Sequence, residues 1–256
     1  MKLSIITCTY NSEKYLQQTI NSIINQKLDN NLFEHIFIDW NSSDNTVEII
    51  EKYINENKDK QIKLIIKEPK WIYNAMNEWI INAKWKYILF LHSDDYLEHN
   101  ILKDYLDFIE QTWNLDLYYA KFNAVNQDWK FIYNAPNRKF YQKWLKKWLF
   151  WLICYINQPT VLHKKTMFEK YWYFNENYKN SSDYEFYIKL AQNMCSSLFF
   201  DKTVTNFRYH ENSASTWKWN DIWTIENIKI LNKYYWIERH FYIFINYLYR
   251  KLTKKS

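Results

Sequence analysis

The feature that most constrains the fold of this 256-residue chain is that it contains no glycine and 14 tryptophans. Ordinary usage near 7% would supply about 18 glycines. Tryptophan instead occupies turn-like places, after strands, between short apolar runs and at the ends of helical patterns, namely at Trp40, Trp71, Trp85, Trp113, Trp129 and Trp172. Such places favour a positive φ, which glycine adopts freely and which costs a bulky residue about 1–2 kcal/mol. A marginally stable domain cannot tolerate many such sites.

Two explanations of the tryptophans are open. In the first, codons that mean glycine in the source organism stand as tryptophan in this sequence, so the natural chain has glycine at these turns. In the second, the protein is genuinely rich in tryptophan. Under the first explanation, every motif below is to be interpreted with glycine at these positions.

Composition predicts a globular protein, because 48% of the residues are hydrophobic, 24% are charged and only three are proline. The length suits one large domain or two closely packed halves. Cys8, Cys154 and Cys195 are widely spaced and form no metal-ligand pattern, which favours a reduced, cytoplasmic compartment. The sequence starts with a strand pattern instead of a signal peptide and has no run of 18 apolar residues, so we expect no membrane span.

The net charge of +6 is concentrated in part at the C-terminus. Residues 237–256 contain five basic residues against the single acid Glu238, interleaved with aromatic side chains. This pattern is typical of a helix that lies on an anionic membrane surface. A last helix packed on the domain, followed by a solvated tail, explains the pattern equally well.

Strands and amphipathic helices alternate over the first hundred residues. Strand patterns cover residues 3–9, 33–39, 62–67 and 86–92, and helical patterns with one apolar face follow the first three. This order predicts a parallel sheet wound with helices on both faces. Ligands bind such sheets beyond the carboxyl ends of the strands, which points to residues 9–10, Asp39 and residues 93–95.

The second half is less regular. We expect helices over residues 97–112 and 182–193, strands over 115–120 and 160–163, a hairpin around Trp129 and strands near 198–208. No internal repeat or flexible linker separates the halves, so they are expected to share one structural unit.

Seven ordered motifs give the chain a family resemblance. They are SIITCTYNS (residues 4–12), IDWNSSDNT (38–46), EPKWIYNAMN (68–77), FLHSDD (90–95), QPTV (158–161), KYWYFN (170–175) and DYEF (183–186). In order and spacing they resemble the family-2 glycosyltransferases of the GT-A fold, over about residues 3–210. The match becomes closer with glycine at positions 40, 71, 79 and 85.

The resemblance implies an α/β GT-A fold with a Rossmann-like, mostly parallel sheet and helices on both faces. It divides the chain into a nucleotide-sugar-binding half (1–96), an acceptor-binding and catalytic half (97–215) and a C-terminal helical tail (216–256). It also implies a divalent metal, Mg²⁺ or Mn²⁺, because a departing diphosphate needs a hard cation to hold its charge. By resemblance, Ser93, Asp94 and Asp95 form the DXD-type motif, with Asp95 on the metal and Asp94 near the ribose or sugar. An ordinary solvated turn is the alternative for this acidic pair.

The resemblance assigns further residues to the nucleotide-sugar. Asp39 would hydrogen-bond the nucleobase, usually uracil, and Thr9 and Tyr10 would line the same pocket. Asn74 matches a position near the nucleotide, although its motif looks one residue short. The alternatives are a turn aspartate at 39 and a core residue at Tyr10.

Inverting sugar transfer needs one carboxylate to take the proton of the acceptor hydroxyl, and Asp183 matches the family's catalytic aspartate. Ser182 or Asp183 could equally cap the helix that follows, and the two roles are compatible. Glu185 is a second candidate for the base. His210 sits where relatives often have a histidine near the metal or diphosphate, whereas a lone histidine is more often an ordinary surface residue. Arg208 could neutralise phosphate.

The predicted function is therefore a metal-dependent, inverting glycosyltransferase with a UDP-sugar donor. The expected acceptor is a glycan or a lipid-linked saccharide of a surface polysaccharide of the cell envelope. The basic tail suggests a cytoplasmic protein in peripheral contact with the membrane. A non-catalytic nucleotide- or glycan-binding relative is the alternative, and it gains if real tryptophans crowd the donor pocket. A nucleic-acid binder is disfavoured because the lysines alternate with acids.

Overall fold

The computed structural model describes residues 2–68, 72–112, 114–135, 156–211 and 220–235. Its strands are β1 (Leu3–Thr9), β2 (Phe33–Asp39), β3 (Gln61–Ile66), β4 (Tyr87–Phe90), β5 (Tyr96–Leu97), β6 (Leu117–Asn126), β7 (Phe131–Ala135), β8 (Leu162–Lys164) and β9 (Ser197–Tyr209). Its helices are α1 (Glu13–Ile24), α2 (Thr46–Glu56), α3 (Ile72–Asn82), α4 (Ile101–Gln111), α6 (Lys165–Tyr171), α7 (Ser182–Gln192) and α8 (Asn220–Tyr234), with a 3₁₀ turn at Gln158–Thr160.

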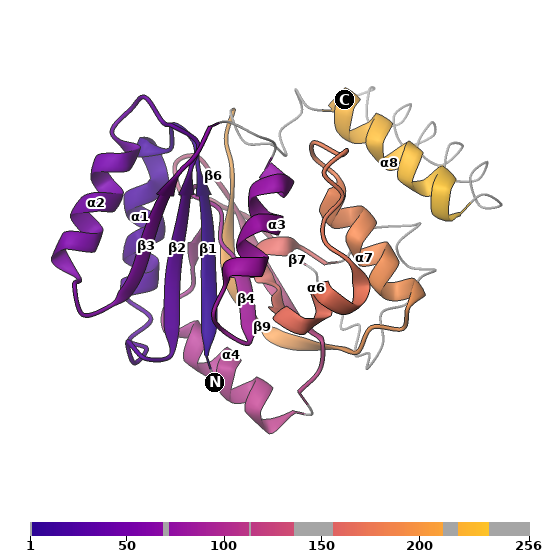
Figure 1. Ribbon diagram of the computed structural model, residues 1–256, viewed down its shortest axis with the longest axis horizontal. Helices are drawn as coiled ribbons and strands as arrows, with labels where there is room; N and C mark the ends of the chain where they lie inside the picture. The colour runs from indigo at the N-terminus through magenta and orange to yellow at the C-terminus, as the bar shows by residue number, and fades with distance from the viewer. Residues whose placement is uncertain (1, 69–71, 113, 136–155, 212–219, 236–256) are drawn as a thin grey trace.

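The strands form one mixed sheet in the order β3-β2-β1-β4-β8-β6-β9-β5, and β7 pairs with the outer part of β6 (Figure 1). Strands β3, β2, β1 and β4 are mutually parallel, as the alternation of strand and helix predicts. Strand β8 is antiparallel to β4 and to β6, and so joins the parallel block to the second half. The two halves therefore share one continuous sheet.

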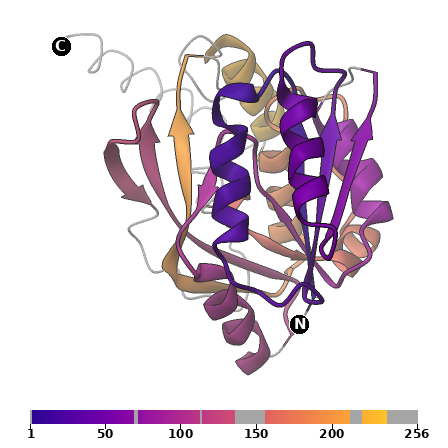
Figure 2. The same cartoon turned by 90° about the vertical axis from the view of Figure 1, so that its left-hand side faces the viewer.

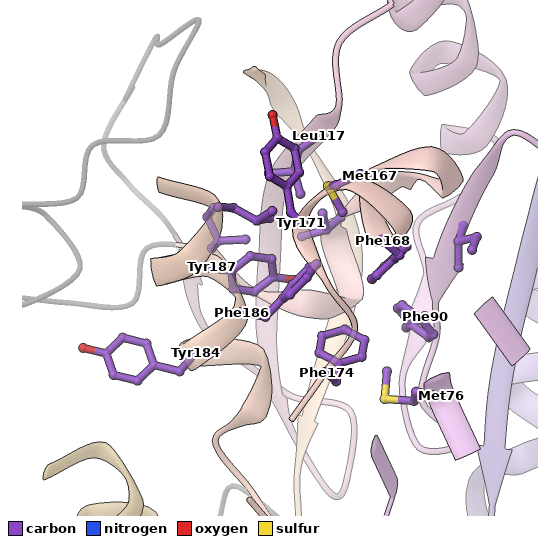
Figure 3. Close-up of a cluster of buried hydrophobic side chains, with 14 of the residues drawn as sticks. Met76, Phe90, Leu117, Met167, Phe168, Tyr171, Phe174, Tyr184, Phe186 and Tyr187 are labelled. Carbon is purple, nitrogen blue, oxygen red and sulfur yellow. The ribbon is translucent and has the colours of Figure 1, made fainter. Parts of the chain in front are cut away.

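Helices cover both faces of this sheet. Figure 2 shows α1 and α2 side by side in front of the first strands, where Leu16, Ile20 and Ile50 pack on Phe37. The opposite face carries α3, α6 and α7, whose apolar side chains pack with those of the strands in the largest core cluster of the described residues (Figure 3). In that cluster the rings of Phe168 and Phe186 stack with centroids 5.2 Å apart. Large buried apolar surfaces of this kind supply most of the stability of a domain.

Element boundaries in the second half differ from the sequence prediction. Helix α4 starts at Ile101 instead of 97, because Tyr96 and Leu97 pair with Asn206 and Thr205 of β9. Strand β6 continues to Asn126 because its outer half pairs with both β7 and β9. Pairing partners far away in the sequence decide these boundaries, and local patterns carry no trace of them.

Two of the turn-like tryptophans lie in the backbone region that favours glycine. Trp129, in the β6–β7 hairpin, has φ 70°, and Trp172, which ends α6, has φ 76° and ψ 167°. The second combination is essentially confined to glycine. Trp40 and Trp85 do not have a positive φ; beside Trp40 it is Asn41 that does, at φ 52°. Trp71 and Trp113 lie outside the described residues.

Replacing Trp172 with glycine is expected to raise the free energy of unfolding by about 1–2 kcal/mol. The change relieves a backbone strain of about 1–3 kcal/mol, and the greater entropy of glycine in the unfolded chain offsets part of this gain. Its side chain is 59% exposed, so little packing is lost. The matched control is Trp172→Ala, which removes the ring and keeps the Cβ. Urea unfolding of the three proteins separates the two effects, and equal stability of the glycine and alanine variants would refute backbone strain.

The C-terminal region from residue 216 contains α8, and the basic aromatic stretch 237–256 lies outside the described residues. Among the helices in the described part of the chain, none has the length and apolar character needed to cross a membrane.

Candidate active site

The ends of β1 and β2 meet at one edge of the sheet, with Thr9 paired to Asp39. The Thr9 hydroxyl donates to Asp39 Oδ2 at 2.7 Å, and the Ser42 amide donates to Asp39 Oδ1 at 2.8 Å. Asp39 therefore serves the turn that follows β2, and the same bonds fix its carboxylate at the sheet edge. Tyr10 is 56% exposed, which excludes the core position considered as its alternative.

A cavity of about 240 Å³ opens beyond β2 and β3 and is lined by Trp40, Lys67, Glu68, Asn74, Ala75 and Glu78. Asn74 thus lies at the edge expected for a nucleotide. Its amide also donates to Glu176 Oε2 at 2.7 Å. Asn74 therefore both lines the cavity and bonds the segment before α7.

A larger hollow of about 620 Å³ runs along the outer side of α1, lined among others by Gln17, Asn21, Tyr96 and Gln127. It contains none of the strand-end carboxylates. One of its lining residues, Tyr15, has its ring 4.9 Å from that of His210. The chemistry-bearing groups are therefore at the sheet edge and not in the larger hollow.

Asp94 and His210 face each other across that edge, since His210 Nε2 lies 2.9 Å from Asp94 Oδ2. Both side chains remain partly exposed. Burial opposes ionisation of Asp94, but the hydrogen bond from His210 and nearby positive charge outweigh it, so the pKa of Asp94 is below its ordinary value. Asp94 is thus an ionised carboxylate that a cation or a sugar hydroxyl can reach.

Asp95 lies deeper, with 1% of its surface exposed. Its Oδ1 accepts the Arg208 amide at 2.9 Å, whereas Oδ2 is buried without a hydrogen-bond partner among the described residues. Burial and the adjacent Asp94 charge raise the pKa of Asp95 well above its ordinary value. Arg208 is also buried, and its guanidinium donates to the carbonyls of Asp94 and Gln127, so it serves the packing here and is not open to phosphate.

The donor set fits a divalent cation shared with a diphosphate. Carboxylate oxygens suit Mg²⁺ and Mn²⁺, and imidazole is an accepted ligand of the latter. In the described part of the chain no three His, Cys, Asp or Glu side chains converge as a self-sufficient metal cage. Asp94 and His210 would provide two ligands, the orphaned oxygen of Asp95 lies behind them, and phosphate oxygens would complete the coordination.

Asp183 lies in the first turn of α7, where its Oδ1 accepts the Tyr73 hydroxyl at 3.0 Å and the Tyr184 amide at 2.9 Å. The helix cap is Ser181, so neither of the two predicted cap residues, Ser182 and Asp183, is the cap; both lie in the first turn of the helix. Burial raises the pKa of Asp183, against the lowering effect of these hydrogen bonds. A raised pKa improves a carboxylate as a proton acceptor near neutral pH.

Glu185 is occupied elsewhere. It is fully buried, and its carboxylate accepts Lys233 at 2.8 Å, the Tyr234 hydroxyl at 3.0 Å and an ion pair from Lys189 at 3.0 Å. Burial would raise the pKa of Glu185, but the two lysines lower it below its ordinary value. This environment suits an anchor between helices and disfavours Glu185 as the base.

His92 belongs to the site and was missed by the sequence analysis. It directly follows Leu91 after β4 and lies close enough to Asp94 and Asp183 that its charge lowers the pKa of both carboxyls, against the effect of their burial. The signal that could have found it is its place at a strand end, which is the signal that identified residues 93–95. His92 therefore lies on the same side of the sheet edge as both carboxyls.

The family model for glycosyl transferase family 2 matches residues 4–172. The chain belongs to this family. The matched residues end before α7 and α8, so the match does not extend to Asp183. Family membership makes glycosyl transfer the chain's class of reaction, and the sheet with its helices has the GT-A fold.

Curated relatives agree. The chain is 31% identical over 204 residues to the poly(ribitol-phosphate) beta-N-acetylglucosaminyltransferase TarS of Staphylococcus aureus (strain MW2), covering 75% of this chain and 33% of that protein. It is 28% identical over 195 residues to the chondroitin synthase of Pasteurella multocida (strain Pm70), covering 74% of this chain and 19% of that protein. The chain thus spans a third or less of these relatives.

Solved structures share the fold. The crystal structure of S. aureus TarS superposes with a TM-score of 0.70 at 24% identity, over 94% of this chain and 44% of that one. The mannosyltransferase PcManGT from Pyrobaculum calidifontis, in complex with GDP-Man and Mn²⁺, gives a TM-score of 0.67 at 14% identity, over 91% of this chain and 63% of that one.

Proposed function

We propose that the chain transfers a sugar from a nucleoside-diphosphate donor, a UDP-sugar, to a glycan hydroxyl with inversion. The observation that carries the proposal is the difference between two carboxylates. Asp94 is hydrogen-bonded to His210 and has a lowered pKa, whereas Asp183 accepts the Tyr73 hydroxyl and has a pKa that burial raises. One carboxylate suits the leaving diphosphate and its cation, and the other suits proton transfer from the acceptor. Two carboxylates in different environments are what such a division of roles requires.

The donor nucleotide is proposed to lie beyond β1, β2 and β3. Asp39 and Thr9 are buried, and Thr9 and Ser42 hold the Asp39 carboxylate, so a bond from Asp39 to the base would replace one of these bonds. The exposed ring of Tyr10 would stack on the base. Asn74 lines the neighbouring cavity. The structure of S. aureus TarS in complex with UDP-GlcNAc supports uracil as the base.

We assign Asp94 and His210 as the protein ligands of the cation, in preference to Asp95. The oxygens of Asp94 are accessible, whereas one oxygen of Asp95 is bonded to the Arg208 amide and the other is enclosed. The cation, when bound, would offset the charge that develops on the diphosphate. The Mn²⁺ in the complex of PcManGT supports a divalent cation.

Asp183 is proposed as the base. Its carboxylate takes the proton of the acceptor hydroxyl while that oxygen forms a bond to the anomeric carbon. The bond from the same carbon to the diphosphate oxygen breaks on the opposite face, so the configuration inverts and UDP leaves with the electron pair. Tyr73 donates to Asp183 Oδ1 and leaves Oδ2 for the incoming hydroxyl.

The acceptor is proposed to be a glycan or a lipid-linked saccharide of the cell envelope, and the polymers named for the two curated relatives, poly(ribitol-phosphate) and chondroitin, support a polymeric acceptor. The basic residues of 237–256 support peripheral contact with an anionic membrane from the cytoplasmic side.

One observation favours a second candidate, a binding protein without turnover. Trp40 lines the proposed nucleotide cavity, and its indole takes space that glycine would leave free. If Trp40 is the natural residue, the donor site is smaller than a UDP-sugar requires.

The test measures release of UDP from UDP-GlcNAc, UDP-glucose and UDP-galactose with Mn²⁺ or Mg²⁺, with poly(ribitol phosphate) as one acceptor. It is made on both the unaltered chain and its Trp40→Gly variant. We expect metal-dependent UDP release from one donor, faster in the glycine variant. Tight UDP binding by both proteins without any release would favour the binding protein. Peptide mass spectrometry of the protein from its own organism would identify the natural residues at 40, 71 and 85.

A further inference from the structure

The segment between α6 and α7, residues 172–181, delivers Asp183 to the site. From one side, α3 holds this segment. The Asn77 amide donates to the Phe174 carbonyl at 2.8 Å and Asn77 Oδ1 accepts the Phe174 amide at 2.9 Å. Tyr73 of the same helix bonds Asp183 directly. The early part of the segment and the carboxylate itself are thus tied to α3.

The later part of the segment is held by Glu226 of α8. Glu226 Oε1 accepts the Lys179 amide at 2.7 Å, and Oε2 accepts the Asn180 amide at 2.9 Å. The side chain is 7% exposed, so both bonds are shielded from water. Hydrogen bonds from backbone amides to a buried carboxylate are about twice as strong as neutral ones.

At the N-terminus of α7 the Asp183 carboxylate accepts the Tyr184 amide, whereas the amides of Lys179 and Asn180, just before the helix, are accepted by Glu226. The cap residue Ser181 makes no capping hydrogen bond, and the hydroxyls of Ser181 and Ser182 are buried without partners among the described residues. Helix N-termini are stabilised by negative charge and by acceptors for their free amides. The Glu226 carboxylate brings a negative charge from another helix to the residues immediately before the turn that carries Asp183.

A second contact fixes the same two helices. Lys233 and Tyr234 of α8 both bond Glu185, which stands two residues after Asp183. Figure 1 shows α8 above α7. The contact of Glu226 with residues 179 and 180 and the contact of α8 with Glu185 therefore reach the first turn of α7 from the same side. Because Glu226 contacts the segment before Asp183 and Glu185 lies after it, α8 determines both flanks of the carboxylate.

We infer that Glu226 is a positioning residue for the proposed base: through the Lys179 and Asn180 amides it sets the place and direction of the Asp183 carboxylate toward the acceptor hydroxyl. This inference rests on the proposed role of Asp183. It makes α8, which lies beyond the residues matched by the family model, part of what the transfer reaction requires.

The test compares Glu226→Gln and Glu226→Ala with Lys229→Gln, an exposed change on the same helix. Loss of charge-assisted bonds should speed amide hydrogen exchange at Lys179 and Asn180 roughly tenfold or more, with alanine exceeding glutamine. Because a misplacement of about 1 Å can cost about 100-fold in rate, kcat should fall roughly 10- to 100-fold. The KM for the donor should stay unchanged, and Lys229→Gln should match the unaltered chain in all three quantities.

Hydrogen exchange needs no substrate, which separates the two hypotheses. Unchanged exchange at 179 and 180 would overturn the inference. Faster exchange with an unaltered kcat would also overturn the inference, because Glu226 would then be a structural residue alone. The same holds if kcat and the donor KM change together, in proportion to a general loss of stability. Absence of transfer by the unaltered chain would instead reject the proposed function.

Discussion

Replacing Asp183 by asparagine is expected to lower kcat for sugar transfer by about 10²–10⁴-fold, the range that a general base contributes. Asparagine keeps the shape of the side chain and can still accept the Tyr73 hydroxyl, so the site should stay assembled. What disappears is the negative oxygen that takes the acceptor proton. Affinity for UDP, measured by calorimetry, should remain within about twofold, because nothing assigned to the nucleotide changes.

The pH dependence gives an independent check. The base works only when deprotonated, and burial raises the pKa of Asp183. The transfer rate should therefore fall as the pH drops through a pKa above that of an ordinary aspartate, and Asp183→Asn should lose this limb. Tyr73→Phe removes a hydrogen bond that favours the ionised form, so it should move the limb to higher pH.

Glu185→Gln is the contrasting variant. Glu185 is bonded to Lys189, Lys233 and Tyr234, so its loss should lower the free energy of unfolding more than it affects the chemical step. If Glu185→Gln abolished transfer at unchanged stability while Asp183→Asn remained active, the roles proposed for the two carboxylates would have to be exchanged.

The first half of the fold was predictable because its information is local. Buried strands end in polar residues and helices show one apolar face, so the parallel order of β1, β2 and β4 follows from the pattern and the handedness of crossovers. The second half was less predictable, since β6 pairs with β9, about 80 residues away, and β5 is only two residues long. No periodicity signals such pairings.

The candidate site divides in the same way. Strand ends indicated Asp39, Asp94 and Asp95, and the family resemblance indicated Asp183 and His210. Which of Asp94 and Asp95 is accessible depends on the Arg208 amide, which lies more than a hundred residues away in the sequence. The contact of Glu226 with residues 179 and 180 likewise exists only once α8 has packed on α7.

Replacing Asp94 by asparagine should abolish the part of UDP affinity that depends on Mn²⁺ and lower transfer by about 10³-fold, because a cation on a leaving diphosphate contributes several kcal/mol. Asparagine can still bond His210, so the change removes mainly charge. Calorimetric titration of UDP, with and without Mn²⁺, isolates the metal from the chemical step. Metal-free binding should be unchanged, since Asp39 and Thr9 are untouched.

Asp95→Asn is the matched control, because it makes the same chemical change at the neighbouring aspartate and so shows which of Asp94 and Asp95 binds the cation. Its Oδ1 can still accept the Arg208 amide, and the enclosed oxygen of Asp95 is replaced by an amide that also lacks a partner. If Asp94 holds the cation, Asp95→Asn should weaken Mn²⁺-dependent UDP binding less than Asp94→Asn does. It should also lower the free energy of unfolding at neutral pH less, because burial and the Asp94 charge oppose the ionised form of Asp95. The reverse order of metal dependence would move the cation to Asp95 and leave Asp94 with the ribose or sugar, the arrangement that the family resemblance alone implies.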